Sequence, residues 1–180
     1  MALVLSIRTQ GSLAAAEQLP DLTAEGYDGA VWLWQVDDAR AAQWVSRRLA
    51  KNQRVLVVSP CYIAQAGQPA SVEALKLHAC LVVREGRTTS QAFNVWPLQN
   101  GKACDTLQTV RVTRPLCSNS GELVRDWCLA GRGIMLRSLW DIAPQLSTGQ
   151  LIRVLPGWSM LNADIQWLAP HRPEGPRRIR

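Results

Sequence analysis

Three small polar side chains stand in a row at the predicted start of a helix: Ser118, Asn119 and Ser120. Asn119 can cap this helix, and Glu122 follows three residues later, as in a capping box. Hydroxyl and amide groups beside the free backbone N–H groups of a positive helix end suit a carboxylate or another anion. The sequence therefore predicts an anion-binding position here, with simple helix capping as the competing interpretation.

Two further positions carry side chains that suit an anionic ligand. Ser59 precedes Pro60 at a second predicted helix start, since serine is a common cap and proline fits the first helical position. Arg137 and Ser138 follow a short apolar strand, residues 134–136, and α/β folds usually collect ligands at such strand ends. Arg137 could pair with a ligand carboxylate, and an ordinary solvent-exposed arginine is the alternative.

The motifs of common enzyme classes are absent from the sequence. It contains no G-x-S-x-G, H-E-x-x-H or G-x-x-x-x-G-K-[ST] pattern, and its two histidines, His78 and His171, are far apart. The five cysteines form no C-x-x-C pair and no zinc-ligand spacing. We therefore expect a binding protein rather than an enzyme, with no catalytic residue, no metal site and no cofactor.

The charge balance does not indicate a nucleic-acid-binding surface. The net charge is +6, and the tail after Pro170 supplies three of these units through four arginines against Glu174. No run approaches the roughly 18 apolar residues of a membrane span, and the apolar start is too short for a signal sequence. We expect a soluble, cytoplasmic chain that contacts no membrane.

The candidate residues depend on an alternating order of strands and helices. After Asn119, the residues Leu123, Trp127 and Ala130 recur at helical spacing, with Val124 and Cys128 beside them, and predict a one-sided helix that a glycine pair ends. Strands are predicted at residues 3–7, 29–33, 55–58, 81–83, 134–136 and 151–155, and a hairpin at residues 93–98 and 103–113. A helical turn is predicted at residues 21–27 and an Ala-rich helix or loop at residues 12–18. Short helices are predicted after Ser59, Ser71 and Ser138, and Pro144 keeps the last of them short.

The pattern around these candidates is similar to that of one protein family. The string SNSGELVRDWCLAGRGIMLRSLWDIAP, followed by GQLIRVLP, closely resembles the effector-binding domain of LysR-type transcriptional regulators. The resemblance continues upstream in RVLVVSPCYIAQAGQPASVEALKLHACLVV and in DLTAEGYDGAV, so it covers roughly residues 19–169 in the family's order. It implies an α/β fold of the periplasmic-binding-protein-like type 2: two α/β lobes, two crossover strands (the first at residues 55–58) and a small-molecule cleft between the lobes.

The resemblance also implies a division of the chain, with an incomplete first lobe. Residues 1–57 and 165–180 would form this partial lobe, and residues 58–164 the second. In the first lobe, Trp32 and Trp34 replace the arginine and glycine of the family's D-x-A-x-R-x-G and lie on one strand face, as a wall of the cleft or as core. The family's first strand–helix unit and its closing helix have no counterpart, so we expect a fragment or a shortened relative, truncated at both ends.

The function that the resemblance implies is sensing of a small, carboxylate-bearing metabolite in the cleft between the lobes. Control of transcription would pass through a helix-turn-helix DNA-binding domain that this chain lacks, and a homodimer or higher oligomer is expected. The alternatives are a structural or oligomerisation module with a degenerate cleft, and a periplasmic-type solute-binding protein. A redox pair of Cys117 and Cys128, as in peroxide-sensing relatives, is a further possibility for regulation.

Overall fold

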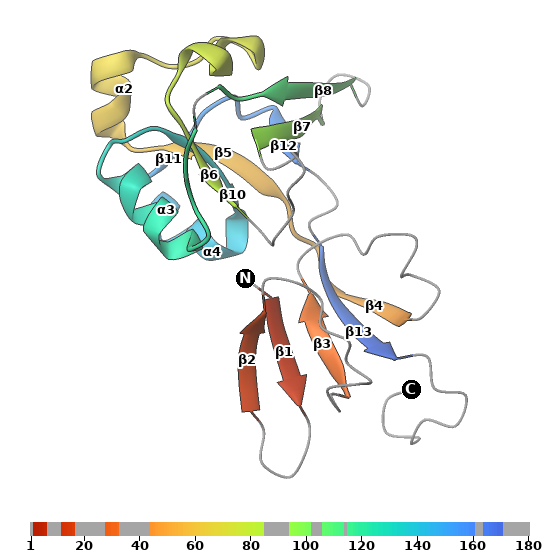
Figure 1. Cartoon of the computed structure of the whole chain (residues 1–180). Helices are drawn as coiled ribbons and strands as arrows, with labels where there is room; N and C mark the ends of the chain where they lie inside the picture. Colours follow the sequence, from red (N-terminus) through yellow and green to blue (C-terminus); the bar gives the residue numbers. More distant parts are fainter. Residues whose placement is uncertain are drawn as a thin grey trace. The chain divides into compact units, whose positions relative to one another are not determined.

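The chain divides into two compact units, which we call unit 1 and unit 2. The structure is a computed structural model that describes residues 2–6, 12–16, 28–32, 44–84, 94–101, 106–113, 115–160 and 164–170. Unit 1 contains residues 1–51 and 164–180, and unit 2 contains residues 52–163 (Figure 1). The strand at residues 54–58, which we expected to cross between lobes, therefore lies wholly within unit 2.

Unit 1 is built on an antiparallel sheet of five strands in the order β2-β1-β3-β13-β4. These strands are β1 (Ala2–Ser6), β2 (Ser12–Ala16), β3 (Gly29–Trp32), β4 (Trp44–Ala50) and β13 (Ile165–Pro170). The expected Ala-rich helix or loop at residues 12–18 is wrong, because β2 pairs with β1 along its whole length, from Ala2 opposite Ala16 to Ser6 opposite Ser12. Pairing between strands overrides the helix preference of three consecutive alanines.

Unit 2 is built on a mixed sheet in the order β8-β7-β12-β5-β10-β6-β9, with β11 also paired to β5. Its strands are β5 (Arg54–Val58), β6 (Cys80–Val83), β7 (Val95–Asn100), β8 (Thr106–Arg111), β9 (Leu116–Ser118), β10 (Ile134–Ser138), β11 (Ile152–Arg153) and β12 (Trp158–Met160). The neighbours β10, β6 and β9 run parallel, whereas β5 is antiparallel to β10. The expected hairpin is confirmed as the antiparallel pair β7–β8.

Four helical segments complete the described part of unit 2: α2 (Pro60–Ala66), the 3-10 helix η1 (Glu73–Leu77), α3 (Gly121–Leu129) and α4 (Leu139–Ser147). The expected start of α2 is confirmed, because the Ser59 hydroxyl accepts a hydrogen bond from the backbone N–H of Tyr62 at 3.4 Å. Helix α4 is short, with nine residues, as expected, but Pro144 does not end it, since the helix continues to Ser147. No helix in the described ranges is long and apolar enough to cross a membrane.

Helix α3 is rotated relative to the sequence expectation. Its fully buried residues are Val124 and Cys128, whereas Leu123 is 42% exposed and Ala130 is also exposed. The predicted face is therefore wrong at Leu123 and Ala130, whereas Val124 and Cys128, which we expected beside it, form its buried centre. The sequence contains two neighbouring sets of apolar residues at helical spacing, one with Leu123 and Trp127 and one with Val124 and Cys128, so spacing alone does not decide which set is buried.

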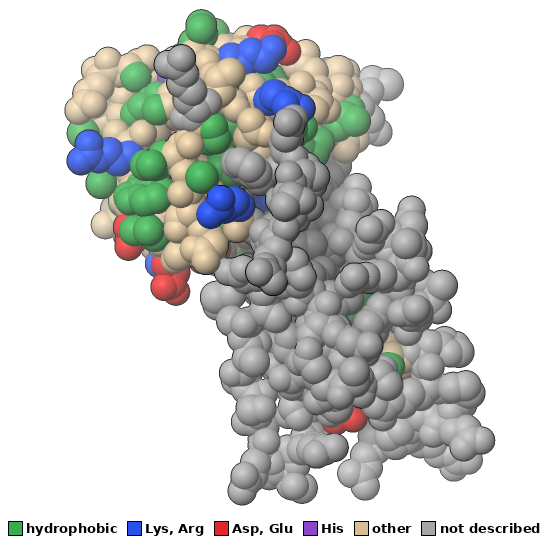
Figure 2. Space-filling view, viewed as in Figure 1, with side chains coloured by type: hydrophobic (Ala, Val, Ile, Leu, Met, Phe, Trp, Pro, Cys, Tyr) green, Lys and Arg blue, Asp and Glu red, His purple; other side chains and the backbone are tan. Residues whose placement is uncertain are grey.

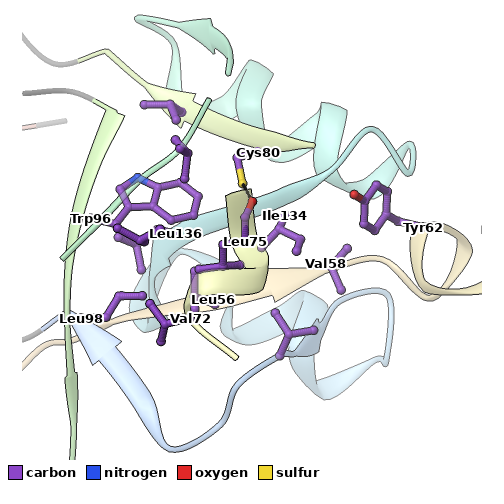
Figure 3. Packing of buried hydrophobic residues seen from close by; sticks show 14 residues of the cluster. Leu56, Val58, Tyr62, Val72, Leu75, Cys80, Trp96, Leu98, Ile134 and Leu136 are labelled. Carbon is purple, nitrogen blue, oxygen red and sulfur yellow. Dashed lines mark hydrogen bonds between the residues drawn. The ribbon is translucent and has the colours of Figure 1, made fainter. Parts of the chain in front are cut away.

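The core lies on both faces of the unit 2 sheet, and β5 shows how. Leu56 and Val58 belong to one cluster, and Val55 and Val57 belong to the other, as the two-residue period of a strand requires. The first cluster gathers side chains from α2, η1 and the β7–β8 hairpin, with Trp96 among them (Figure 3). The second lies under α3 and α4, so the sheet is covered on both sides, as an α/β unit requires.

Candidate functional site

One edge of the unit 2 sheet collects most of the predicted ligand residues. Strands β6, β9 and β10 run parallel, and Val83 pairs with Ser118 at the ends of β6 and β9. Since β5 is antiparallel to β10, its first residue, Arg54, lies opposite Ser138 at the end of β10. We call this the carboxyl edge: the ends of β6, β9 and β10 together with the starts of β5, α3 and α4. Such edges are where open α/β sheets bind ligands.

The start of α3 is held by two serine hydroxyls. Ser120, and not Asn119 as expected, is the cap: its Oγ accepts a hydrogen bond from the backbone N–H of Leu123 at 3.3 Å. Ser118 Oγ accepts from the backbone N–H of Ser120 at 3.0 Å and so fixes the turn between β9 and α3. Capping is therefore part of what these residues do, and each hydroxyl keeps its own O–H to donate.

Arg137 brings a positive charge to the same place. Its side chain is 13% exposed, so the alternative of an ordinary solvent-exposed arginine is wrong. Its Nε donates to Oδ2 of Asp141 at 2.5 Å, and its guanidinium lies against Gly121, the first residue of α3. The positive end of α3 and the Arg137 cation are thus side by side, and both favour an anion.

Asp141 is shared between two arginines. Its second carboxylate oxygen, Oδ1, accepts a hydrogen bond from Nη1 of Arg125, at 3.2 Å. This pair joins α3 to α4, while the pair with Arg137 joins α4 to the end of β10. Two cations against one carboxylate leave this cluster of three side chains with one positive charge in excess.

Ser138 and Ser59 occupy different environments from those expected. Ser138 caps no backbone N–H; its Oγ donates instead to Oδ1 of Asn52 at 2.9 Å, which fastens the entry to β5. Ser59 is buried at the end of β5, and because β5 is antiparallel to β10, this end lies at the opposite edge of the sheet. The structure therefore does not bring Ser59 together with Ser118, Ser120 and Arg137.

The predicted tryptophan positions lie mostly outside the described residues. Trp32 is the last residue of β3, and its backbone pairs with Gln166 of β13, but its side chain is outside them. Trp34 lies outside them entirely. Both remain predictions.

Three residues of the carboxyl edge were missed by the sequence argument: Gly121, Arg125 and Asp141. The spacing of four between Arg137 and Asp141 is that of an ion pair on a helix. That spacing is the signal that could have found it. Nothing in the sequence links Gly121 to Arg137, because their contact joins two separate elements.

The described cysteines do not form a redox pair. Cys117 packs with the first core cluster and Cys128 with the second, so they lie on opposite faces of the sheet. The thiol of Cys128 is fully buried and donates to the carbonyls of Val57 and Gly133. Burial raises the pKa of this thiol to about 12, which keeps it protonated and unreactive at neutral pH.

Comparison with known families and curated proteins finds relatives of this chain. The family described as "LysR substrate binding domain" matches residues 7–180. The chain is 40% identical over 140 residues to the HTH-type transcriptional regulator DmlR of Escherichia coli K12, covering 78% of this chain and 43% of that protein. It is 41% identical over 125 residues to the HTH-type transcriptional activator TtdR of E. coli UTI89, covering 69% and 38%. The chain thus spans less than half the length of these relatives.

Solved structures show the same fold. The regulatory domain of AphB from Vibrio vulnificus superposes with a TM-score of 0.64 at 25% identity, over 91% of this chain and 74% of that one. The full-length virulence activator AphB of Vibrio cholerae gives a TM-score of 0.70 at 25% identity, over 89% of this chain and 51% of that one. The regulatory domain of CrgA from Neisseria meningitidis gives a TM-score of 0.63 at 24% identity, over 83% of this chain and 68% of that one.

Proposed function

Since this chain belongs to the LysR substrate-binding domain family, we propose that it binds a small carboxylate at the carboxyl edge of unit 2. Ligand binding then changes how the DNA-binding part of a longer regulator holds its DNA. This regulation takes place in the cytoplasm, where the DNA lies. The relatives named above are HTH-type regulators, so DNA contact belongs to the helix-turn-helix part of the parent protein. Binding proceeds without turnover, and the parent protein works as a homo-oligomer.

The observation that carries this proposal is the position of Arg137 beside the amino end of α3. A mostly buried arginine, one helix terminus and the hydroxyls of Ser118 and Ser120 converge there. A carboxylate accepts charge-assisted hydrogen bonds from each of these donors, which are stronger than bonds between neutral groups. A neutral ligand of the same shape gains less, so the site favours anions.

The face of unit 2 that Figure 2 shows supports a role other than direct DNA binding. Basic, acidic and apolar side chains are interspersed on the described part of unit 2 that Figure 2 shows, with no continuous basic field. A protein that binds DNA directly needs a basic patch or stripe. A ligand-sensing role needs no basic patch on unit 2. It requires that ligand binding favours one of two conformations of the regulator.

A thermal-shift screen with matched ligand pairs tests the proposal. We would titrate the whole chain with acetate, benzoate, succinate and citrate, each beside its neutral amide. A carboxylate at about 100 times its dissociation constant adds roughly 2.7 kcal/mol of stability and raises the unfolding temperature, while its amide does not. Equal shifts with acid and amide would contradict a charge-based site, and a flat response to every carboxylate would count against the proposed ligand class.

A further inference from the structure

Gly121 opens α3 at a cost, because glycine is a poor helix former. Its backbone does not require glycine: the glycines with positive φ are Gly67, Gly131, Gly133 and Gly149 among the described residues. The reason is space. A Cβ on Gly121 would lie 2.3 Å from Nη2 of Arg137 and 2.5 Å from Nη1. The guanidinium therefore occupies the volume that any side chain at position 121 would need.

Asp141 fixes the guanidinium from its other end. Its Oδ2 accepts the single hydrogen of Arg137 Nε. The remaining four N–H groups of the guanidinium sit on Nη1 and Nη2, next to the first residue of α3. A planar fork held in this way matches the two oxygens of a carboxylate.

We infer that Gly121 and Asp141 are positioning residues for Arg137: the glycine makes room for the guanidinium, and the carboxylate holds Nε so that Nη1 and Nη2 face the ligand together. This inference rests on the proposed function and adds to it the two residues that set the orientation of the arginine. Holding the fork before the ligand arrives lowers the entropy cost of binding.

Two effects of Asp141 on an anionic ligand have opposite signs. Its negative charge repels the ligand, and its hold on Arg137 favours the ligand. The repulsion is weak because Asp141 is already paired with Arg125 as well as Arg137. We therefore expect orientation to dominate, so that loss of Asp141 weakens carboxylate binding although it makes the edge more positive.

Nitrogen-15 NMR of the arginine Nε–H groups in the whole chain tests the positioning without any ligand. The Arg137 signal is assigned by its loss in Arg137→Lys. In the native chain we expect the chemical shift of this Nε–H group to differ from that of a free arginine and its hydrogen to exchange slowly with water. In Asp141→Asn and Gly121→Ala we expect the shift to move to the value of a free arginine and the exchange to become fast. Matched controls are Asp126→Asn, an exposed carboxylate on α3, and Gly101→Ala, whose Cβ meets nothing within 4 Å. An unchanged Arg137 signal in Asp141→Asn overturns the inference.

Titration of the same samples with succinate, or with the carboxylate that the screen selects, links positioning to binding. We expect affinity to fall about tenfold in Asp141→Asn and in Gly121→Ala, equivalent to ~1.4 kcal/mol, and to stay within about twofold in the two controls. Asp141→Asn keeps the size of the side chain. If Gly121→Ala disturbs α3, Asp141→Asn therefore still shows whether the positioning of Arg137 affects carboxylate affinity. Higher affinity in Asp141→Asn overturns the inference. A positioned Arg137 in a chain that binds no carboxylate refutes the proposed function and leaves the positioning supported.

Discussion

Ser120 and Ser118 contribute differently at the start of α3, and single substitutions separate their contributions. Ser120→Ala removes the cap and should lower the free energy of unfolding by about 1 kcal/mol. Ser118→Ala leaves the cap in place, so we expect a smaller loss of stability and a loss of carboxylate affinity of about tenfold or more, since a hydrogen bond to a charged group is worth about 1.5–3 kcal/mol. Urea unfolding and calorimetric titration measure the two quantities. Unchanged affinity in Ser118→Ala would assign this hydroxyl to the turn alone.

Two buried thiols make the stability of unit 2 sensitive to alkaline pH. Burial raises the pKa of Cys80 and of Cys128 to about 12, from 9.0. Thiols in the unfolded chain lose their protons from about pH 9, whereas the two thiols in the folded chain keep theirs to about pH 12. Their contribution to the free energy of unfolding is therefore fully present below about pH 9 and is lost as the pH rises from about 9 to about 12. The slope is about 1.4 kcal/mol per pH unit for each thiol.

Urea unfolding under reducing conditions between pH 8 and about pH 10.5 checks this expectation. Cys128→Ala should remove one thiol's share of the slope and leave the share of Cys80 in place. A slope that Cys128→Ala does not alter would mean that this thiol titrates in the folded chain as it does in the unfolded one.

At the level of elements, the turn from α3 into β10 depends on a glycine. A Cβ on Gly133 would lie 2.5 Å from the carbonyl oxygen of Ala79, which accepts the N–H of Ile134. Gly133→Ala should therefore cost about 3 kcal/mol or more, because close packing and backbone strain add together. Gly67→Ala is the matched control: its φ is 73° and its Cβ meets nothing within 4 Å, so about 1–2 kcal/mol is expected. Equal losses in unfolding experiments would contradict the steric explanation.

Sequence patterns predicted most elements of unit 2 because these elements carry strong local signals. The run at residues 55–58, the Ser-Pro start of α2 and the hairpin around Asn100-Gly101 depend on alternation, capping and turn chemistry. The strand β2 was missed because its partner β1, and not its own composition, decides its structure. The cap of α3 was placed one residue early, since Asn119 and Ser120 are equally good caps by type.

The site was only partly predictable for a related reason. Ser118, Ser120 and Arg137 follow from helix starts and strand ends, which are local features. The contact of Arg137 with Gly121 and the sharing of Asp141 depend on the packing of α3, α4 and β10. The placement of Ser59 at the opposite edge depends on the antiparallel direction of β5. Strand direction and packing between elements are properties of the tertiary fold, which local patterns do not carry.

At the level of the whole molecule, unit 2 is a continuous segment that contains every described residue of the carboxyl edge. The described part of residues 52–163 has two core clusters and a mixed sheet of its own. We therefore expect this segment, produced alone, to unfold cooperatively and to keep the displaced Arg137 Nε–H signal. Circular dichroism and NMR of the segment measure both properties. A segment that shows no cooperative transition would mean that unit 1 is needed for the fold of unit 2.

The central claim is that a carboxylate binds at the carboxyl edge through Arg137. Isothermal titration calorimetry of the whole chain with the carboxylate selected by the screen tests it most directly, in the native chain, in Arg137→Gln, and in Arg132→Gln as a control. Arg132 is exposed just beyond the carboxyl end of α3, so the control loses the same charge away from the site. We predict saturable binding that weakens at least tenfold in Arg137→Gln and stays within about twofold in Arg132→Gln. Equal affinity in all three chains would contradict the account and place the ligand elsewhere.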